Sequence, residues 1–338
     1  MDFQDPDEVR RWATQQWGTV DLGDERPNKR AALLGEKLAA HPDGSLPEQT
    51  RSWGELKAAY RLLGQEEVTF ERLSTPHWLN TRQQAGARHG GVLLFIQDGS
   101  DLDFRAPKGP KRRPRAAGQQ GGLRSLGLLL HSCLATLPEG GVGETLLLGL
   151  AHQKVWARQK EEVYRGNETR AQRYRRRTES DLWAETLEAI GPVPEHTTWV
   201  SVGDRGSDVF SYLRGARALG WECLLRVGQE DRRIETAPTG EIGHLFELLG
   251  SLAGRTETEV EVRGRAGKPK RTASLKVDWR RVKIMPPRNR PEQRDAEPIE
   301  GWCVRAWEEE EREDALEWIL FCTLPVAEAD SALEKVGW

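Results

Sequence analysis

The segment GGVLLFIQD (residues 90–98) is the feature that most constrains how this chain can fold. Its apolar run is continuous and ends in Asp98, as is typical of a strand that is buried on both faces of a sheet. A second segment, HTTWVSVGD (residues 196–204), carries alternating apolar residues and ends in Asp204. The sequence therefore predicts two core strands, each of which ends in an aspartate.

The residues after the second strand predict a turn and then a helix. Val209, Phe210 and Leu213 have helical spacing, and Ser207 or Asp208 is the expected helix cap. A strand-end aspartate at such a place is either an ordinary turn residue or half of a metal site. Two facing carboxylates suit Mg²⁺, which prefers oxygen ligands, and two such ions about 4 Å apart promote phosphoryl transfer. The spacing alone leaves both interpretations open.

The first 75 residues predict short helices. One helix is expected to begin after Asp24 as its cap and to stop at His41–Pro42. The leucines expected on one face of it are Leu33, Leu34 and Leu38. The segment SWGELKAAYRLL (52–63) has the pattern of an amphipathic helix. Its periodic apolar residues are Trp53, Leu56, Tyr60 and Leu63. A third helix is expected to begin near Thr75–Pro76, with proline in its first turn.

From residue 91 onward the pattern changes to consecutive strands and then to strands that alternate with helices, which predicts a mixed sheet flanked by helices. Residues 228–300 interrupt this alternation with two strands joined by a basic turn, and they predict a β insertion. In the second of these strands, Val282 and Ile284 face away from Leu275, Val277 and Trp279 unless Arg280–Arg281 form a bulge. The predicted segments are 1–75, 76–227, 228–300 and 301–338.

The net charge of −3 hides a segregation of charge along the chain. Three segments are strongly basic, at residues 105–115, 165–177 and 262–283, whereas acidic residues are concentrated at 308–317. A single run of this kind is usually a solvated loop. Three of them in one chain favour a surface that faces a polyanion such as nucleic acid.

Several classes of protein are disfavoured by the sequence. No segment is apolar enough to span a bilayer, and the first residues, MDFQDPDEVRRW, lack the pattern of a secretory signal. The four cysteines stand singly, and neither a CxxC nor an HExxH pattern occurs, which argues against zinc and for a reducing, cytoplasmic location. A phosphate-binding P-loop is also missing.

Taken in order, the motifs resemble the DDE transposases of bacterial insertion sequences, in the Tn-five-like branch, over nearly the whole chain. LGDERPNKR (22–30) and SWGELKAAYRLL (52–63) are similar to the family's N-terminal end-binding domain. LLFIQDGSDLDF (93–104) resembles the strand with the first catalytic aspartate. VGDRGSDVFSYL (202–213) resembles the second, with its DRxxD signature, and EWILFCTLPV (317–326) resembles the strand after the family's β insertion.

The resemblance implies a fold and an activity. The fold would be α/β, with a ribonuclease H-like mixed sheet core, an inserted β subdomain and a helical N-terminal DNA-binding domain. The activity would be cut-and-paste transposition, in which a homodimer binds double-stranded DNA at transposon ends and in the target. The chemistry would be phosphoryl transfer that depends on Mg²⁺, with Mn²⁺ as a substitute. No membrane would be involved.

The resemblance also implies roles for individual residues. Asp98 and Asp204 would be catalytic metal ligands, and Arg226 would lie near the scissile phosphate. Trp318 would stack on a flipped base. Residues expected near the transposon end are Arg26, Arg30, Tyr60 and Arg61. The alternatives are that Trp318 is a core residue, that Arg226 is a buried ion-pair partner and that the helix arginines only face solvent. Asp101 and Asp103 have no counterpart in the family and are not expected to be ligands.

One departure from the family bears on activity. The family's third acid is a glutamate in a Y-x2-R-x3-E helix, and the expected position of that motif falls beyond Trp338. Glu328 and Glu334 lie near the right place but in a different motif. The chain is therefore expected to be a truncated transposase that lacks the dimerisation helices and is inactive in cleavage. The alternatives are a DNA-binding remnant that inhibits full-length copies, and a metal-dependent nuclease of ribonuclease H-like fold.

Overall fold

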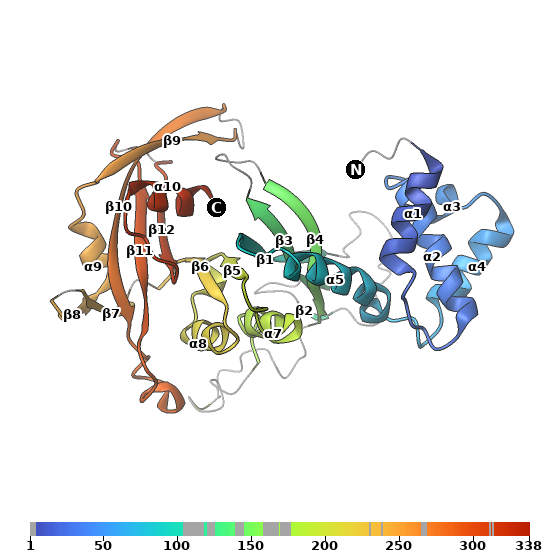
Figure 1. Cartoon of the computed structure of the whole chain (residues 1–338), viewed down its shortest axis with the longest axis horizontal. Coiled ribbons are helices and arrows are strands. Elements are labelled where there is room, and N and C mark those ends of the chain that lie inside the picture. Colours follow the sequence, from blue (N-terminus) through green and yellow to red (C-terminus); the bar gives the residue numbers. More distant parts are fainter. Residues whose placement is uncertain are drawn as a thin grey trace. The chain divides into compact units, whose positions relative to one another are not determined.

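The computed structural model describes residues 5–103, 118–119, 126–138, 145–157, 169, 177–229, 231–237, 239–264, 269–310, 312 and 314–338. The chain divides into two compact units (Figure 1). The first comprises Met1–Ala87 with Leu148–Ala151, and the second comprises Arg88–Leu147 with His152–Trp338. None of the described helices is long and apolar enough to cross a membrane. Of the three basic segments, 105–115 and nearly all of 165–177 lie outside the described residues.

The first unit is helical. Its helices are α1 (Pro6–Trp17), α2 (Glu25–Ala40), α3 (Leu46–Gln49), α4 (Trp53–Leu63) and α5 (Phe70–Gly86). Asp24 caps α2 as predicted, because its Oδ1 accepts a hydrogen bond of 2.8 Å from the backbone N–H of Arg26. The apolar core of the unit is small and joins α2, α4 and the segment between α1 and α2. Its buried members are Val20, Leu22, Ala31, Leu34, Ala59 and Leu62.

Three expectations for these helices are wrong in detail. In α2 only Leu34 of the three predicted leucines is buried, and in α4 the predicted apolar stripe faces solvent, with Trp53 74% exposed. The reason is that α4 contacts the core through one alanine and one leucine, Ala59 and Leu62. α5 begins at Phe70, after Thr69 as cap, so Pro76 lies inside the helix and not in its first turn.

The second unit is built on one large mixed sheet. Its strands are β1 (Val92–Asp103), β2 (Gly118–Gln119), β3 (Leu126–Pro138), β4 (Thr145–Trp156), β5 (Thr198–Gly203), β6 (Glu222–Arg226), β7 (Arg233–Thr236), β8 (Ile242–His244), β9 (Thr256–Val262), β10 (Arg271–Ile284), β11 (Ile299–Trp307) and β12 (Glu317–Cys322). The strand order is β2-β3-β1-β5-β6-β12-β11-β10-β7-β8, with β4 paired to β3 and β9 paired to β10. β1, β5 and β6 run parallel, and β3 and β12 flank them in the antiparallel sense. The predicted mixed sheet with helices is confirmed.

The two faces of the central strands bury different side chains. On one face, Leu94, Val200, Leu224 and Cys322 form a cluster that the last residue of the described chain, Trp338, also contacts. On the other face, aromatic rings pack closely, as between Phe95 and Trp199, whose centroids are 4.6 Å apart. The helices α7 (Asp181–Ile190) and α8 (Phe210–Ala218) contribute Trp183 and Tyr212 to the aromatic packing of this unit. β1 is thus buried on both faces, as its apolar run predicts. β5 is buried on both faces as well, although its alternating sequence pattern predicts a half-buried strand.

The β insertion continues the same sheet. The register between β10 and β11 is uniform from Lys276–Trp307 to Ile284–Ile299, so no bulge is present and Val282 and Ile284 face away from Trp279. Both sets of side chains are nevertheless buried. The helix α9 (Leu245–Gly250) lies between β8 and β9 in the chain, and α10 (Ala329–Gly337) packs on β10–β12 through Ala332 and its neighbours (Figure 1).

Candidate DNA-binding surface and strand-end carboxylates

An open pocket of about 570 Å³ lies between α2 and α4 in the first unit. Three of the residues that line it are arginines that the sequence predicted near DNA, Arg26 and Arg30 from α2 and Arg61 from α4. The cap at the start of α2 fixes the helix register, and the spacing of four residues puts Arg26 and Arg30 on one face. Two acidic side chains, Asp24 and Glu67, also line the pocket, so its lining is basic on balance.

The three arginines of this pocket are exposed, and no ion pair involves them within the part of the chain that the structure describes. Lys29, on the same helix, differs because its Nζ lies 2.6 Å from the Glu25 carboxylate. Exposed guanidinium groups without a carboxylate partner are available to bind an anion, and arginine matches the geometry of a phosphate well.

The exposed stripe of α4 lies beside this pocket along the helix. Trp53 and Tyr60 are 74% and 55% exposed, and Lys57 and Arg61 are exposed on the same helix. Tyr60 was predicted near DNA, and its exposure is consistent with that role. Aromatic and basic side chains that alternate on one solvated surface are typical of nucleic-acid-binding surfaces.

Two basic residues of the third segment are neutralised by acidic partners. Within β10, Arg271 forms a bidentate pair with Glu308, with N–O distances of 2.5 and 2.8 Å, and Lys276 binds Glu309 at 2.6 Å. The acidic segment that the sequence places some 30 residues later thus folds back onto β10 and neutralises much of its charge. The expectation that all of 262–283 faces a polyanion is therefore not supported for these side chains.

Asp98 and Asp204 stand at corresponding positions on adjacent strands. β1 and β5 are paired in parallel up to Ile96 and Val202, and each aspartate follows two residues later. Both side chains are exposed. Each carboxylate accepts one short backbone hydrogen bond, from Gly99 to Asp98 at 2.8 Å and from Gly206 to Asp204 at 2.7 Å. Within the described residues, their remaining lone pairs are open to a ligand.

Arg226 continues the same line across the sheet. β5 and β6 are paired up to Gly203 and Leu225, so Arg226 is the counterpart of Asp204. Partial burial, together with the charge of Arg205, lowers the pKa of Arg226, and the charge of Asp204 opposes this effect. Its Nη2 donates to the backbone carbonyl of Glu317 at 3.1 Å. Arg226 thus lies near Asp204 without an ion pair in the described chain.

Trp318 has a mainly structural environment. It opens β12 opposite Ala306 of β11, and it packs, partly buried, on the cluster that includes Val304 and Ala332. The register of β12 against β6 pairs Leu320 with Arg226, so Trp318 stands two residues further along the same face. Part of the indole remains accessible.

A buried polar network lies beside the two aspartates. Gln97 Nε2 donates to Ser201 Oγ at 2.8 Å, and the Tyr212 hydroxyl donates to the same oxygen at 2.7 Å. His131 Nε2 lies 2.9 Å from Gln97 Oε1, so this nitrogen carries the hydrogen. Burial lowers the pKa of His131 to about 4, against the opposing charges of Asp98, Asp204 and Glu185. The network links β1, β3, β5 and α8 directly behind the strand ends.

Asp208 has a role that the sequence did not indicate. It does not cap α8, whose first residue is preceded by Val209 without a side-chain cap. Its buried carboxylate pairs with Arg232 and accepts backbone hydrogen bonds of 3.0 Å from Gly228 and Gln229. Ser207 does not cap α8 either, because its hydroxyl donates to the carbonyl of Asp204. Asp208 therefore ties the start of the β insertion to the turn that carries Asp204.

The two strand-end aspartates are not part of a larger cluster of metal-ligand residues in the described chain. No group of three or more histidine, cysteine, aspartate or glutamate side chains suited to a metal ion occurs among the described residues. Glu328 is engaged as the cap of α10, in a capping box with Ser331, and Glu334 pairs with Lys335. All four cysteines are buried.

Comparisons with known proteins define the class of the first unit. Residues 9–68, which include the pocket and α4, match the transposase DNA-binding family. The match covers the helical first unit and does not extend to the sheet of the second unit. No functionally curated protein matches the chain.

One solved structure that the chain resembles is a piggyBac transposase synaptic complex with hairpin DNA. The identity is 10% and the TM-score is 0.36, over 98% of this chain and 64% of that chain. The chain thus spans less than two thirds of that transposase. The likeness is too distant to carry any argument about the fold or the site.

Proposed function

We propose that this protein is a DNA transposase of the DDE type, related to the Tn-five-like insertion-sequence branch, and that its first unit binds the transposon end. The observation that carries the proposal is the pocket lined by Arg26, Arg30 and Arg61 within the segment that matches the transposase DNA-binding family. These guanidinium groups would hold backbone phosphates, and Tyr60 would contact the duplex beside them. Because phosphate contacts carry no sequence information by themselves, recognition of an end needs base contacts from the same surface.

The catalytic part of the proposal rests on the strand order and the two aspartates. The order β4-β3-β1-β5-β6, in which β3 is antiparallel to the parallel set of β1, β5 and β6, supports a ribonuclease H-like core. Asp98 and Asp204 offer exposed oxygen donors at the ends of the two central strands, which is the chemistry that a hard divalent cation requires.

The residues of this site have distinct tasks in such a reaction. The carboxylates of Asp98 and Asp204 would hold Mg²⁺, or Mn²⁺ in its place. When bound, the cation would supply a Lewis acid for phosphoryl transfer. Arg226, close to Asp204, would neutralise charge on the phosphate that is attacked. Gln97 and Ser201 would hold β1 and β5 in register behind the carboxylates, and the exposed part of Trp318 would stack on a base near the cleavage point.

The proposed DNA binding is tested with the full chain and a pool of random duplexes. Enrichment of one preferred sequence, followed by fluorescence anisotropy on that duplex and on a scrambled one, measures both affinity and specificity. Arg30→Gln and Arg61→Gln are expected to weaken binding to the preferred duplex at least about tenfold. The matched control is Lys29→Gln, since Lys29 is already paired with Glu25 and should change affinity much less. Binding without any sequence preference, or equal losses for Arg30→Gln and Lys29→Gln, would contradict end recognition by this pocket.

A metal-dependent nuclease of the same fold is the competing enzyme class. It predicts cleavage of duplexes that lack the preferred sequence at the same rate as duplexes that carry it. A transposase instead requires the preferred end. Cleavage of both duplexes in Mg²⁺ and in Mn²⁺, measured with protein that has cleavage activity, therefore separates the two classes.

A further inference from the structure

The edge of β10 has a gap in its hydrogen-bonding ladder. One edge of this strand pairs with β9 over residues 271–277 and then with β7 over residues 282–284. Between these two partners, residues 278–281 have no neighbouring strand on that edge within the described residues, although the Ala237 N–H donates to the Arg281 carbonyl at 3.3 Å. Their other edge is paired with β11 throughout. Unpaired backbone groups at such a place need other partners.

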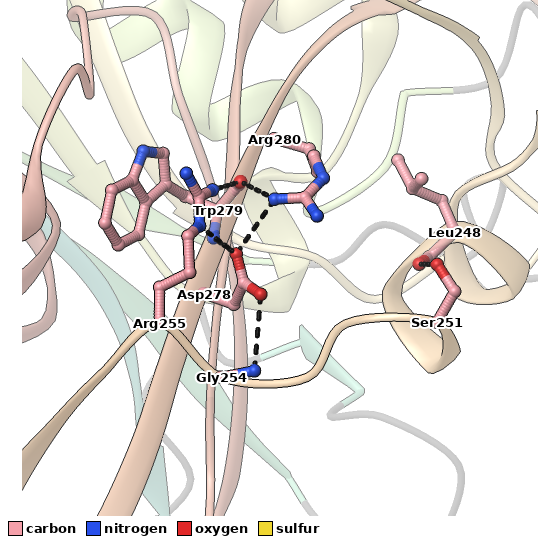
Figure 2. Close-up of polar contacts among 7 residues, drawn as sticks. All are labelled: Leu248, Ser251, Gly254, Arg255, Asp278, Trp279 and Arg280. Carbon is pink, nitrogen blue, oxygen red and sulfur yellow. Dashed lines mark hydrogen bonds and ion pairs between the residues drawn. The ribbon is translucent and has the colours of Figure 1, made fainter.

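Arg255 and Asp278 close this gap (Figure 2). Arg255 lies just before β9, and its Nε donates to Asp278 Oδ1 at 2.6 Å while its Nη2 donates to the carbonyl of Trp279. Asp278 is only 1% exposed, and its Oδ2 accepts from the backbone N–H of Gly254 at 3.3 Å. Gly254 has a φ of +91°, a conformation that glycine adopts readily, and this turn brings Arg255 to the gap.

A second arginine shares the same carboxylate. Arg280 Nη1 lies 3.0 Å from Asp278 Oδ1 and also donates to the Trp279 carbonyl at 2.9 Å. In Figure 2 the two guanidinium groups approach Asp278 and the Trp279 carbonyl from opposite sides. The side chains of Arg255 and Arg280 are 43% and 41% exposed, in contrast to the 2% of Asp278. One buried carboxylate therefore orients two half-exposed cations.

The two guanidinium groups keep unused donors. Each has five N–H donors, of which the contacts above use two. Arg255 is also held by Trp279, because its guanidinium carbon lies 3.7 Å from the centroid of the indole ring. Such fixed side chains lose little conformational freedom when an anion binds, which favours binding.

The neighbouring charges leave this cluster positive. Arg305 is paired with Asp278 in the register of β11 and binds Glu317 at 2.7 Å, and Lys276 binds Glu309. These two cations are therefore neutralised locally, whereas Arg255 and Arg280 share the single charge of Asp278. The arrangement carries an excess of one positive charge at a solvated surface of the sheet.

We propose that Arg255 and Arg280, oriented by Asp278, form a phosphate-binding clamp that holds a backbone phosphate of duplex DNA on the β insertion. The clamp rests on the proposed function, since it supplies a second DNA contact apart from the pocket of the first unit. Two adjacent guanidinium groups with free N–H donors match the oxygens of one phosphate. Both arginines donate to the Trp279 carbonyl in the gap, but Arg255 also joins β10 to the turn before β9, whereas both side-chain contacts of Arg280 are to residues of its own strand. Arg280 is therefore the residue to test.

The test measures binding of the full chain to a 30-base-pair duplex as the salt concentration is raised. Each phosphate contact contributes about 0.9 to the slope of log affinity against log salt concentration. Arg280→Gln is expected to reduce that slope by about 0.9 and to weaken binding several-fold at low salt. Arg280→Lys keeps the charge and is expected to keep a slope close to that of the wild type. The control is Arg281→Gln, because Arg281 is 52% exposed but already binds Glu300 at 2.7 Å.

The outcomes separate this clamp from the broader proposal. A wild-type slope for Arg280→Gln, or an equal fall in slope for Arg281→Gln, would overturn the clamp while leaving DNA binding by the first unit intact. A wild-type chain that binds no duplex at any salt concentration would overturn the clamp and the proposed function together.

Discussion

Asp98 and Asp204 each follow, by two residues, the last paired residues of two adjacent parallel strands, Ile96 of β1 and Val202 of β5. Neighbouring strands lie about 4.8 Å apart, and both carboxylates act on the buried imidazole of His131. The relationship therefore concentrates negative charge at one edge of the sheet, with Arg226 as the next residue along the same line.

The first prediction concerns binding of a divalent cation at these strand ends. Mn²⁺ titration of the full chain, followed by electron paramagnetic resonance, is expected to detect a site that Asp98→Asn or Asp204→Asn weakens about tenfold or more, because each substitution removes a charged oxygen ligand. Asp101→Asn is the control, since Asp101 is exposed on the same strand but faces the other way along the pleat. Unchanged Mn²⁺ affinity in Asp204→Asn would remove the basis for a metal site.

Much of this site is predictable from the sequence, because it depends on local pattern. An apolar run that ends in aspartate marks a buried strand and its end wherever the strand is placed. Two such strands that run parallel in one sheet bring their carboxyl ends to the same edge, even when other strands lie between them in the chain, as β3 and β4 do here. The positions of Asp98 and Asp204 follow from that rule, and the pairing of β1 with β5 agrees with it.

The roles of the neighbouring charged residues are not predictable in this way. Asp208 has the sequence context of a helix cap, but its partner Arg232 lies 24 residues later and only the fold brings the two together. The basic residues of β10 are likewise neutralised by glutamates that are distant in sequence. Local charge runs report where charges are along the chain and not which of them meet after folding.

The second prediction concerns the pH dependence of stability. Burial lowers the pKa of His131 to about 4 in the folded chain, while an unfolded chain has a histidine pKa of about 6.5. As the pH falls from about 6.5 to 4, the unfolded chain binds a proton that the folded chain does not, so stability falls, by at most about 3 kcal/mol. Below pH 4 both states are protonated and this contribution is fully lost.

Urea unfolding at pH 7 and at pH 5 measures this contribution. His131→Gln is expected to reduce the difference between the two pH values, because its amide does not titrate. His89→Gln, at an exposed position, should leave the difference unchanged. An identical pH dependence in wild type and His131→Gln would show that the imidazole does not account for it.

The third prediction concerns the buried pair of Asp208 and Arg232, whose side chains are 1% and 5% exposed. Arg232→Met removes the partner of a buried carboxylate, and the loss of unfolding free energy is expected to be about 3–5 kcal/mol. Arg214→Met, at an exposed position of α8, should stay within about 0.5 kcal/mol of the wild type. Denaturant unfolding of the three proteins makes the comparison, and similar losses for both variants would contradict a specific role of the pair.

The orientation of α4 illustrates why helix faces are hard to assign from periodicity. The spacing of Trp53, Tyr60 and Leu63 predicts an amphipathic helix, and the apolar face of such a helix usually packs on a core. In the structure, Ala59 and Leu62 face it, and the large residues are exposed. A helix that uses its aromatic face for binding has the same periodicity as one that buries it, so the pattern identifies the helix but not the side that packs.

The last prediction tests this orientation by stability and by binding together. Leu62 is 2% exposed within the core of the first unit, so Leu62→Ala is expected to cost about 2–5 kcal/mol of unfolding free energy through the cavity that it leaves. Trp53 is 74% exposed, so Trp53→Ala should change stability by no more than about 0.5 kcal/mol although it deletes a much larger side chain. If the exposed face of α4 contacts DNA, Trp53→Ala should nevertheless weaken binding to the preferred duplex.

Denaturant unfolding and fluorescence anisotropy on the same preparations measure both effects. A larger stability loss for Trp53→Ala than for Leu62→Ala would mean that the apolar stripe packs inward, and the exposed surface described here would then not exist.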